Sequence, residues 1–255
     1  MATIAVPRVR PLVSRFYIAM ATIFVAIAFG GFFATYWLQV ARGSFRGPPI
    51  LHLHGLLFSV WTLFLLSQAS LIARRKLRQH RAWGMFGISL ATAMLFTGMM
   101  VAIGGLKERV DAGYGDAARA FAIVPISGIL LFAVMVAAAI ANVRRPAWHK
   151  RLMLVATAGI LQAALARFFF LAATGGGPGL RPGMGPPLPI ERTVAPGVLV
   201  DLLIVAAMVR DRRSDGRVHP AYWWGLGALL AVQLMRPIVG YTEAWYRFTD
   251  FLLAF

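Results

Sequence analysis

The chain of 255 residues contains no cysteine and only nine acidic residues. The absence of cysteine excludes disulfides, thiolate zinc sites, iron–sulfur clusters held by cysteine and a cysteine nucleophile. Charged residues make up 14% of the chain and hydrophobic residues 59%, whereas an ordinary soluble domain carries about 25% charged residues. So little charge predicts that most of the surface faces hydrocarbon, as in an integral membrane protein.

The scarcity of acidic residues leaves a formal net charge of +17. The lysines and arginines stand in short clusters between apolar runs and form no continuous basic patch of the kind that binds nucleic acid. This distribution is typical of membrane proteins, whose cytoplasmic loops collect basic residues. The predicted partner is therefore the lipid bilayer, and nucleic acid is not expected.

Seven apolar runs are long enough, or nearly so, for a membrane span of roughly 20 residues. They are continuously apolar, whereas the strands of a membrane barrel alternate apolar and polar residues, so we predict an all-α polytopic protein. The first run is longer than the core of a signal peptide, and we expect it to be a retained span. The runs are 16–38, 50–73, 83–104, 120–142, 151–173, 194–209 and 221–240.

The basic clusters also predict an orientation. With the N-terminus in the cytoplasm, roughly twice as many basic residues lie on the cytoplasmic side as outside, and the bias alternates from loop to loop. Seven spans then put the C-terminus outside. We predict one transmembrane bundle over 1–255, in which residues 242–255 form a short amphipathic helix in the outer interface.

Three charged residues fall inside the runs, where they are costly and often functional. Arg167, Asp201 and Arg236 are each predicted to lie roughly 6–10 Å from the outer end of a helix. A buried charge needs a partner, so we expect Asp201 to pair with at least one arginine. Either this pair is purely structural, or the second arginine binds an anionic ligand group.

Two histidines lie near the outer start of the second run. His52 and His54 are two residues apart and point in different directions on a helix, so they should not bind one metal together. His54 shares a helix face with Trp61 and Gln68. Such a histidine either completes an outward-facing polar pocket for a cofactor or ligand, or bonds to a backbone carbonyl at the interface.

Two other histidines, His80 and His149, lie at the cytoplasmic starts of the third and fifth spans. If these helices are neighbours, two neutral imidazoles can bind a haem iron from opposite faces. The alternative is that each histidine bonds to lipid or to a helix end. A second outer histidine on another helix is missing, so at most one haem with two histidine ligands is predicted.

These motifs resemble a family of bacterial multi-pass membrane proteins of unknown function. The shared residues are His54-Gly55, Gln68, Arg74-Arg75, His80-Arg81 with Gly84, His149-Lys150-Arg151 with Met153, and Arg167. The likeness covers roughly half of the chain and departs at Lys150, where arginine is usual. More distantly, the chain resembles haem–copper oxidase assembly proteins and cytochrome b561-type electron carriers. The resemblance implies a bacterial inner-membrane bundle with functional histidine and arginine residues.

No catalytic motif is present: the chain has no Walker A sequence, no His-Glu-x-x-His and no Gly-x-Ser-x-Gly. Catalytic residues are therefore not assigned, and three functions stay open. The first is binding of haem b or a small ligand by histidines. The second is a transporter or sensor with an outward pocket of His54, Arg167, Asp201 and Arg236. The third is a non-catalytic assembly subunit of a membrane complex.

Overall fold

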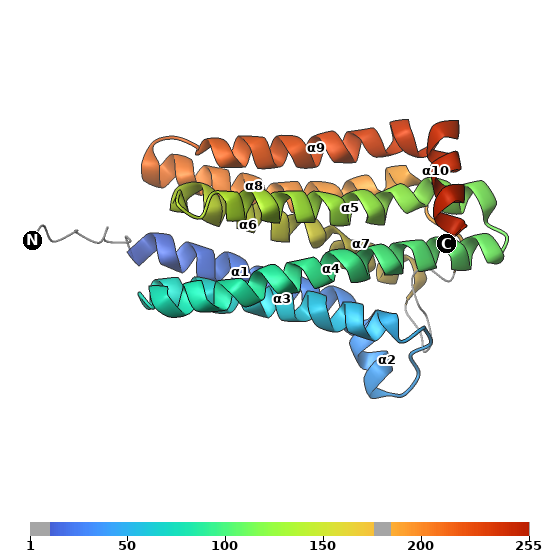
Figure 1. Cartoon of the computed structure of the whole chain (residues 1–255), viewed down its shortest axis with the longest axis horizontal. Coiled ribbons are helices and arrows are strands. Elements are labelled where there is room, and N and C mark those ends of the chain that lie inside the picture. Colours follow the sequence, from blue (N-terminus) through green and yellow to red (C-terminus); the bar gives the residue numbers. More distant parts are fainter. Residues whose placement is uncertain (1–10, 176–184, 255) are drawn as a thin grey trace, which may run out of the picture.

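The computed structural model describes residues 11–175 and 185–254, and these ranges contain helices and connecting turns but no strand. The long helices lie side by side with nearly parallel axes (Figure 1). The predicted all-α class is confirmed. The elements are α1 (Pro11–Phe32), the π-helix η1 (Phe33–Trp37), α2 (Leu38–Ala41), α3 (Ile50–Ala73), α4 (Leu77–Asp111), α5 (Gly115–Ala141), α6 (Pro146–Ile160), α7 (Gln162–Thr174), the 3₁₀-helix η2 (Ile190–Thr193), α8 (Val194–Asp215), α9 (Pro220–Gly240) and α10 (Glu243–Leu253).

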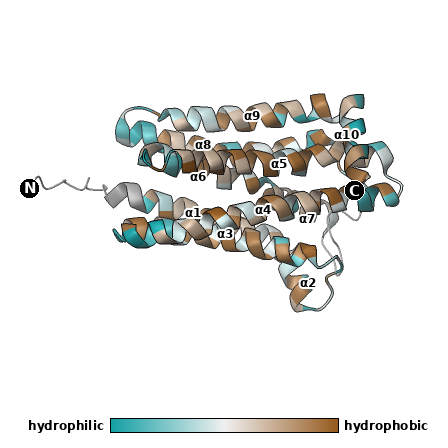
Figure 2. Ribbon diagram, in the orientation of Figure 1, coloured by the Kyte–Doolittle hydropathy of each residue, from teal (hydrophilic) through white to brown (hydrophobic). Residues whose placement is uncertain are grey.

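The two ends of the bundle differ in charge. The turns at 74–76, 142–145 and 216–219 lie at one end, which we call the basic end because lysine and arginine cluster there. The turns at 42–49 and 112–114, together with α10, lie at the other, which we call the opposite end. Figure 2 shows hydrophilic residues concentrated at the ends of the bundle and hydrophobic residues along its length. This division is what a bilayer around the middle of the bundle requires.

Six stretches of the described chain are long and apolar enough to cross a membrane, which supports a multi-pass membrane protein. They are Arg15–Ala41, Ile50–Ala73, Leu77–Asp111, Gly115–Ala141, Pro146–Thr174 and Ile190–Asp215. The seventh predicted span corresponds to α9, which is 21 residues long but does not belong to this set. Gln233 and Arg236 lower its hydropathy.

Local signals explain where several helices begin and end. Pro146 and Pro220 stand in the first turn of α6 and α9, where a proline costs no hydrogen bond and has a suitable φ. Thr242 caps α10 by accepting a hydrogen bond from the Trp245 amide at 3.2 Å. Gly175 and Gly216 end α7 and α8 with φ of 72° and 73°, a conformation that favours glycine.

The core at mid-depth is built around Trp61 of α3, which is 1% exposed. Its indole Nε1 donates to Thr157 Oγ1 of α6 at 3.1 Å. Its ring meets Phe132 of α5 edge to face, with centroids 5.1 Å apart. The tryptophan therefore ties three helices together with its one polar group satisfied, as a buried indole requires. The same face of α3 carries Gln68, also buried, as the seven-residue spacing predicted.

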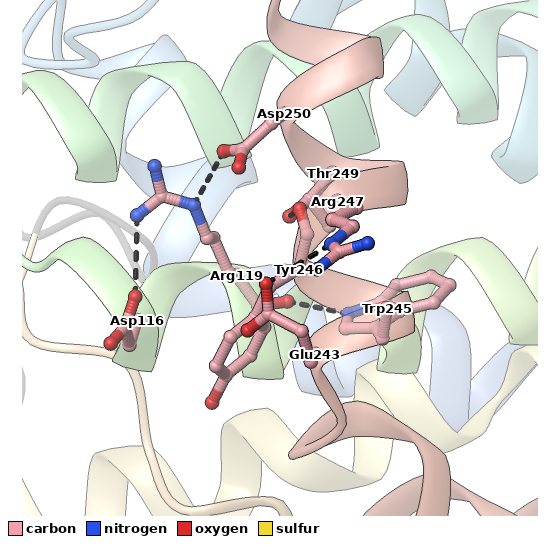
Figure 3. Close-up of polar contacts among 8 residues, drawn as sticks. All are labelled: Asp116, Arg119, Glu243, Trp245, Tyr246, Arg247, Thr249 and Asp250. Atoms are coloured by element: carbon pink, nitrogen blue, oxygen red, sulfur yellow. Dashed lines mark hydrogen bonds and ion pairs between the residues drawn. The ribbon is translucent and has the colours of Figure 1, made fainter.

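The C-terminal helix α10 crosses the opposite end of the bundle and is held by α5 (Figures 1 and 3). Arg119 Nε donates to Asp250 Oδ1 at 2.8 Å, and Trp245 Nε1 donates to the Arg119 carbonyl oxygen at 2.8 Å. Phe248 and Phe251 remain 42% and 58% exposed. An amphipathic helix with outward aromatic rings at a bundle end fits the predicted interfacial helix.

We expect Trp245→Phe to loosen α10, because the variant keeps the ring but leaves the Arg119 carbonyl without its indole donor. The expected cost is about 1 kcal/mol, the usual net contribution of one hydrogen bond. Limited proteolysis of the detergent-solubilised protein, with C-terminal fragments identified by mass spectrometry, measures the change. The matched control is Arg247→Ala, whose pair with Glu243 is 79% and 72% exposed and contributes little. Equal cleavage of the two variants would show that the Trp245 hydrogen bond does not hold α10 against α5.

Candidate functional site

The two predicted haem ligands meet at the basic end. His80 and His149 lie at the starts of α4 and α6, which begin at Leu77 and Pro146, respectively, so they stand at the same depth. Helix α5 packs against both helices. The imidazole ring centroids are 6.4 Å apart and the ring planes cross at 78°. The structure thus brings together the pair that the sequence could only place at equal depth.

The hydrogen bond of His149 defines which of its nitrogens can bind a ligand. Its Nδ1 lies 2.8 Å from the Ala139 carbonyl oxygen. A carbonyl only accepts, so Nδ1 carries the proton and the lone pair stays on Nε2. Metal-binding histidines are commonly oriented in this way.

Unpartnered polar atoms surround the same end of the bundle. His80 Nδ1 is buried without a hydrogen-bond partner, and so are both amide atoms of Gln68. Gln68 and His80 lie on either side of the turn that joins α3 to α4. Buried polar groups are rarely left unpaired unless a ligand or water completes them. His80 and Gln68 therefore leave three buried polar atoms unpaired at the basic end.

A buried ion pair that the sequence analysis missed lies beside this pair. Arg151 Nε and Nη2 both reach Asp211 Oδ2 at 2.7 Å, and the two side chains are 4% and 0% exposed. Asp215, one turn further along α8, lies 3.6 Å from the same guanidinium. By its position, Arg151 is one of the basic residues at the start of the predicted span 151–173. The signal in the sequence for this ion pair is the four-residue spacing of two of the few acids in the chain.

The third basic-end histidine has a structural role. His219 Nδ1 accepts the Ala221 amide proton at 3.1 Å and so caps α9. Burial, and then the charge of Arg151, lower the pKa of His219, which keeps the ring neutral and able to accept. Its ring packs edge-on against Trp148, with centroids 5.3 Å apart. The Nδ1 atom of His219 is therefore used to cap the start of α9.

The expected pairing of Asp201 with an arginine is wrong for the described residues. Asp201 Oδ1 instead accepts a hydrogen bond from Gln233 Nε2 at 3.2 Å. Arg236 directs its donors to neutral oxygens. These acceptors are Ser127 Oγ at 3.0 Å, Gln162 Oε1 at 2.8 Å and the Val124 carbonyl at 3.3 Å. An amide network on α7 and α9 therefore replaces the predicted ion pair.

Arg236 uses three of its five donors within the protein, and little space is left beside it for an exogenous anion. Its Nε, Nη1 and Nη2 atoms are all engaged by the protein. The cavity it lines with Gln162 and Gln233 has a volume of only about 10 Å³, which is the size of a single water. The ligand-binding alternative proposed for the spare arginine therefore does not apply to Arg236.

The remaining predicted residues lie on a different set of helices. His52 Nδ1 is 3.0 Å from the Tyr36 hydroxyl, while the His54 ring stacks on Phe58 with centroids 4.1 Å apart. Arg167 Nη1 donates to the Ala163 carbonyl at 2.8 Å. Among the described residues, no hydrogen bond or ion pair joins His54 or Arg167 to the other two members of the predicted outward pocket. His54 and Arg167 lie on α3 and α7, and Asp201 and Arg236 lie on α8 and α9.

Comparison with known proteins adds no further assignment, because no protein-family model, curated protein or solved structure matches the chain. The resemblance to bacterial multi-pass proteins stays a prediction. The geometry of the side-chain groups described above is therefore the basis for a functional proposal.

Proposed function

We propose that the chain crosses the bacterial inner membrane seven times, with the N-terminus in the cytoplasm and the C-terminus outside. Helix α9 supports the seventh span, since 21 residues extend about 31 Å, close to the thickness of the hydrocarbon core. Leu234 and Ile238 of α9 are 65% and 61% exposed, which suits contact with lipid. Trp223 and Trp224 stand exposed at its basic end, where aromatic rings favour the headgroup region.

Single-cysteine labelling tests this topology cleanly because the chain has no native cysteine. We expect a membrane-impermeant maleimide to label Ala112→Cys and Ala254→Cys in intact spheroplasts. Val143→Cys and Ser214→Cys should be labelled only after lysis. All four positions are exposed and flank α5 or α9. If Ala254→Cys behaves like Ser214→Cys, α9 does not cross the membrane.

We further propose that His80 and His149 are the residues that would hold the iron of a b-type haem. The 6.4 Å between ring centroids carries this proposal. Two imidazoles bound to one metal through bonds of about 2.0–2.1 Å have centroids about 6 Å apart. The described residues hold no group of three or more metal-binding side chains. Two histidines suffice for haem iron, because the porphyrin supplies the other four nitrogens.

The residues around the pair fit this group. The hydrogen bond from His149 Nδ1 to the Ala139 carbonyl oxygen orients the ring and leaves the lone pair of Nε2 for a metal. Lys150 and Arg81 adjoin the two histidines in sequence, and they are the cations that we propose for the haem propionates. Bound haem b would supply one-electron redox chemistry. With no catalytic motif in the sequence, electron exchange with a membrane partner is the activity that this site supports best.

An optical spectrum tests the proposal directly. The full chain, expressed with haem available and purified in detergent, should show a Soret band. On reduction with dithionite it should show the sharp visible bands of low-spin, six-coordinate haem. A purified, folded protein without a Soret band would end the proposal.

A further inference from the structure

Three polar side chains at the opposite end, one buried and two half-buried, each have a buried atom without a hydrogen-bond partner. These atoms are Thr35 Oγ1, His54 Nδ1 and Arg167 Nε, and each is essentially inaccessible to solvent. They come from η1, α3 and α7, and α1, which η1 continues, packs against both α3 and α7. Unpartnered buried groups are uncommon and call for an explanation such as a bound ligand. Three such groups on helices that pack together are best explained by one shared ligand.

Close packing brings these helices together. A methyl group on Gly31 of α1 would lie only 2.3 Å from the Ala164 carbonyl oxygen of α7, so the two backbones are nearly in contact. The next residue, Phe32, places its ring 3.9 Å from the guanidinium carbon of Arg167. On the other side of η1, the Tyr36 ring lies 3.2 Å from the position of a methyl group on Gly55, the neighbour of His54.

Thr35 differs from the other buried threonines. Thr97, Thr157 and Thr249 each donate to a carbonyl about one turn earlier in their helix. Thr35, which is 3% exposed, lies in the π-helical segment η1 and makes no such bond. π-Helical segments occur frequently at functional sites. Its hydroxyl is therefore available to a ligand.

The free edge of Arg167 indicates the chemistry of that ligand. Nη1 is used by the Ala163 carbonyl, while Nε, on the edge that commonly grips two oxygens at once, is unpartnered. No described carboxylate lies within ion-pair distance of Arg167. A planar guanidinium edge with an uncompensated charge is suited to a carboxylate or a phosphate.

We propose that Arg167, His54 and Thr35 form a binding site for an oxyanion, carboxylate or phosphate, inside the opposite half of the bundle. Arg167 supplies the charge and the paired donors, and the other two supply one hydrogen bond each. The aromatic rings of Phe32 and Phe58, stacked on Arg167 and His54, shield the site from water. The site is separate from the histidine pair at the basic end and does not depend on haem.

Calorimetric titration of the full chain in detergent tests the proposal. The probes are sodium benzoate, inorganic phosphate and phosphatidic acid in mixed micelles, with chloride held constant. We expect saturable binding of at least one probe, weakened tenfold or more in Arg167→Gln and in Arg167→Lys, which keeps the charge but not the planar edge. Binding of benzoate assigns a carboxylate, and binding of phosphate a free oxyanion. Binding of phosphatidic acid alone assigns a lipid headgroup.

The control is Arg247→Gln, which removes an exposed arginine at the same end and should leave the affinity unchanged. His54→Ala and Thr35→Val should each weaken binding, and they carry the test if Arg167→Gln does not fold. The proposal is overturned if no probe binds saturably. It is equally overturned if folded Arg167→Lys and His54→Ala bind as tightly as the parent chain.

Discussion

Replacing His149 by alanine is expected to abolish the low-spin haem spectrum of the purified protein. The reason is geometric, because the ring of His80, with its centroid 6.4 Å away, is then left without its opposing ligand. His80→Ala should have the same effect. We expect the six-coordinate bands to disappear in both variants, with loss of haem or conversion to a five-coordinate spectrum. The amount of haem that each variant retains is measured as the haem content per chain, determined as the pyridine haemochrome.

The matched control is His219→Asn, which removes an imidazole at the same end of the bundle but keeps a side chain that can cap α9. Its spectrum should match that of the parent chain. If His80→Ala and His149→Ala retain the same spectrum as the parent, the haem is held elsewhere and the proposed ligands are wrong. Far-UV circular dichroism of each variant separates loss of haem from loss of fold.

Replacing Asp211 by asparagine is expected to destabilise the bundle by about 3–5 kcal/mol, the usual cost of breaking a buried ion pair. The variant leaves the guanidinium of Arg151, 3% exposed, without its buried counter-charge. Asp215 compensates only in part, because it is 41% exposed and lies 3.6 Å away. Unfolding in mixed micelles of dodecyl maltoside and sodium dodecyl sulfate, followed by circular dichroism, measures the loss.

A double variant distinguishes an unpaired charge from a simple loss of contacts. Arg151→Met with Asp211→Leu removes both charges of the buried pair, so it should recover part of the lost stability. Arg210, whose Nη1 lies 3.3 Å from Asp211 Oδ1, still loses its partner. Glu243→Gln is the control, because its partner Arg247 is 79% exposed and the pair should be worth less than about 1 kcal/mol. An Asp211→Asn variant as stable as the parent would show that the pair contributes nothing.

The apolar runs of the sequence located the helices well but not their ends. Helix α3 spans Ile50–Ala73, as predicted, because proline precedes it and arginines follow it directly. The run 83–104 lies inside α4, which covers Leu77–Asp111. Hydropathy marks where lipid touches the chain, whereas the helix continues into the charged residues on either side. The predicted run 151–173 is interrupted at Leu161, two residues after Gly159.

The predicted site residues had mixed outcomes, for a related reason. Depth along a helix follows from the rise per residue, so the level of His80 and His149 was predictable. The rotation of each helix about its axis was not, and it decides which charges meet. Asp201 therefore faces Gln233, and Arg236 faces Ser127, although both charged residues are buried in the bundle.

By itself, the sequence determined that this chain is a helical membrane protein, because few charges and long apolar runs leave no other way to satisfy its backbone. It also determined which end of the bundle is basic. Only the tertiary structure decided that His80 meets His149, that Arg151 is buried against Asp211, and that Asp201 pairs with Gln233. These pairings join helices far apart in the chain, and they depend on helix order and rotation, which side-chain packing sets and hydropathy does not encode.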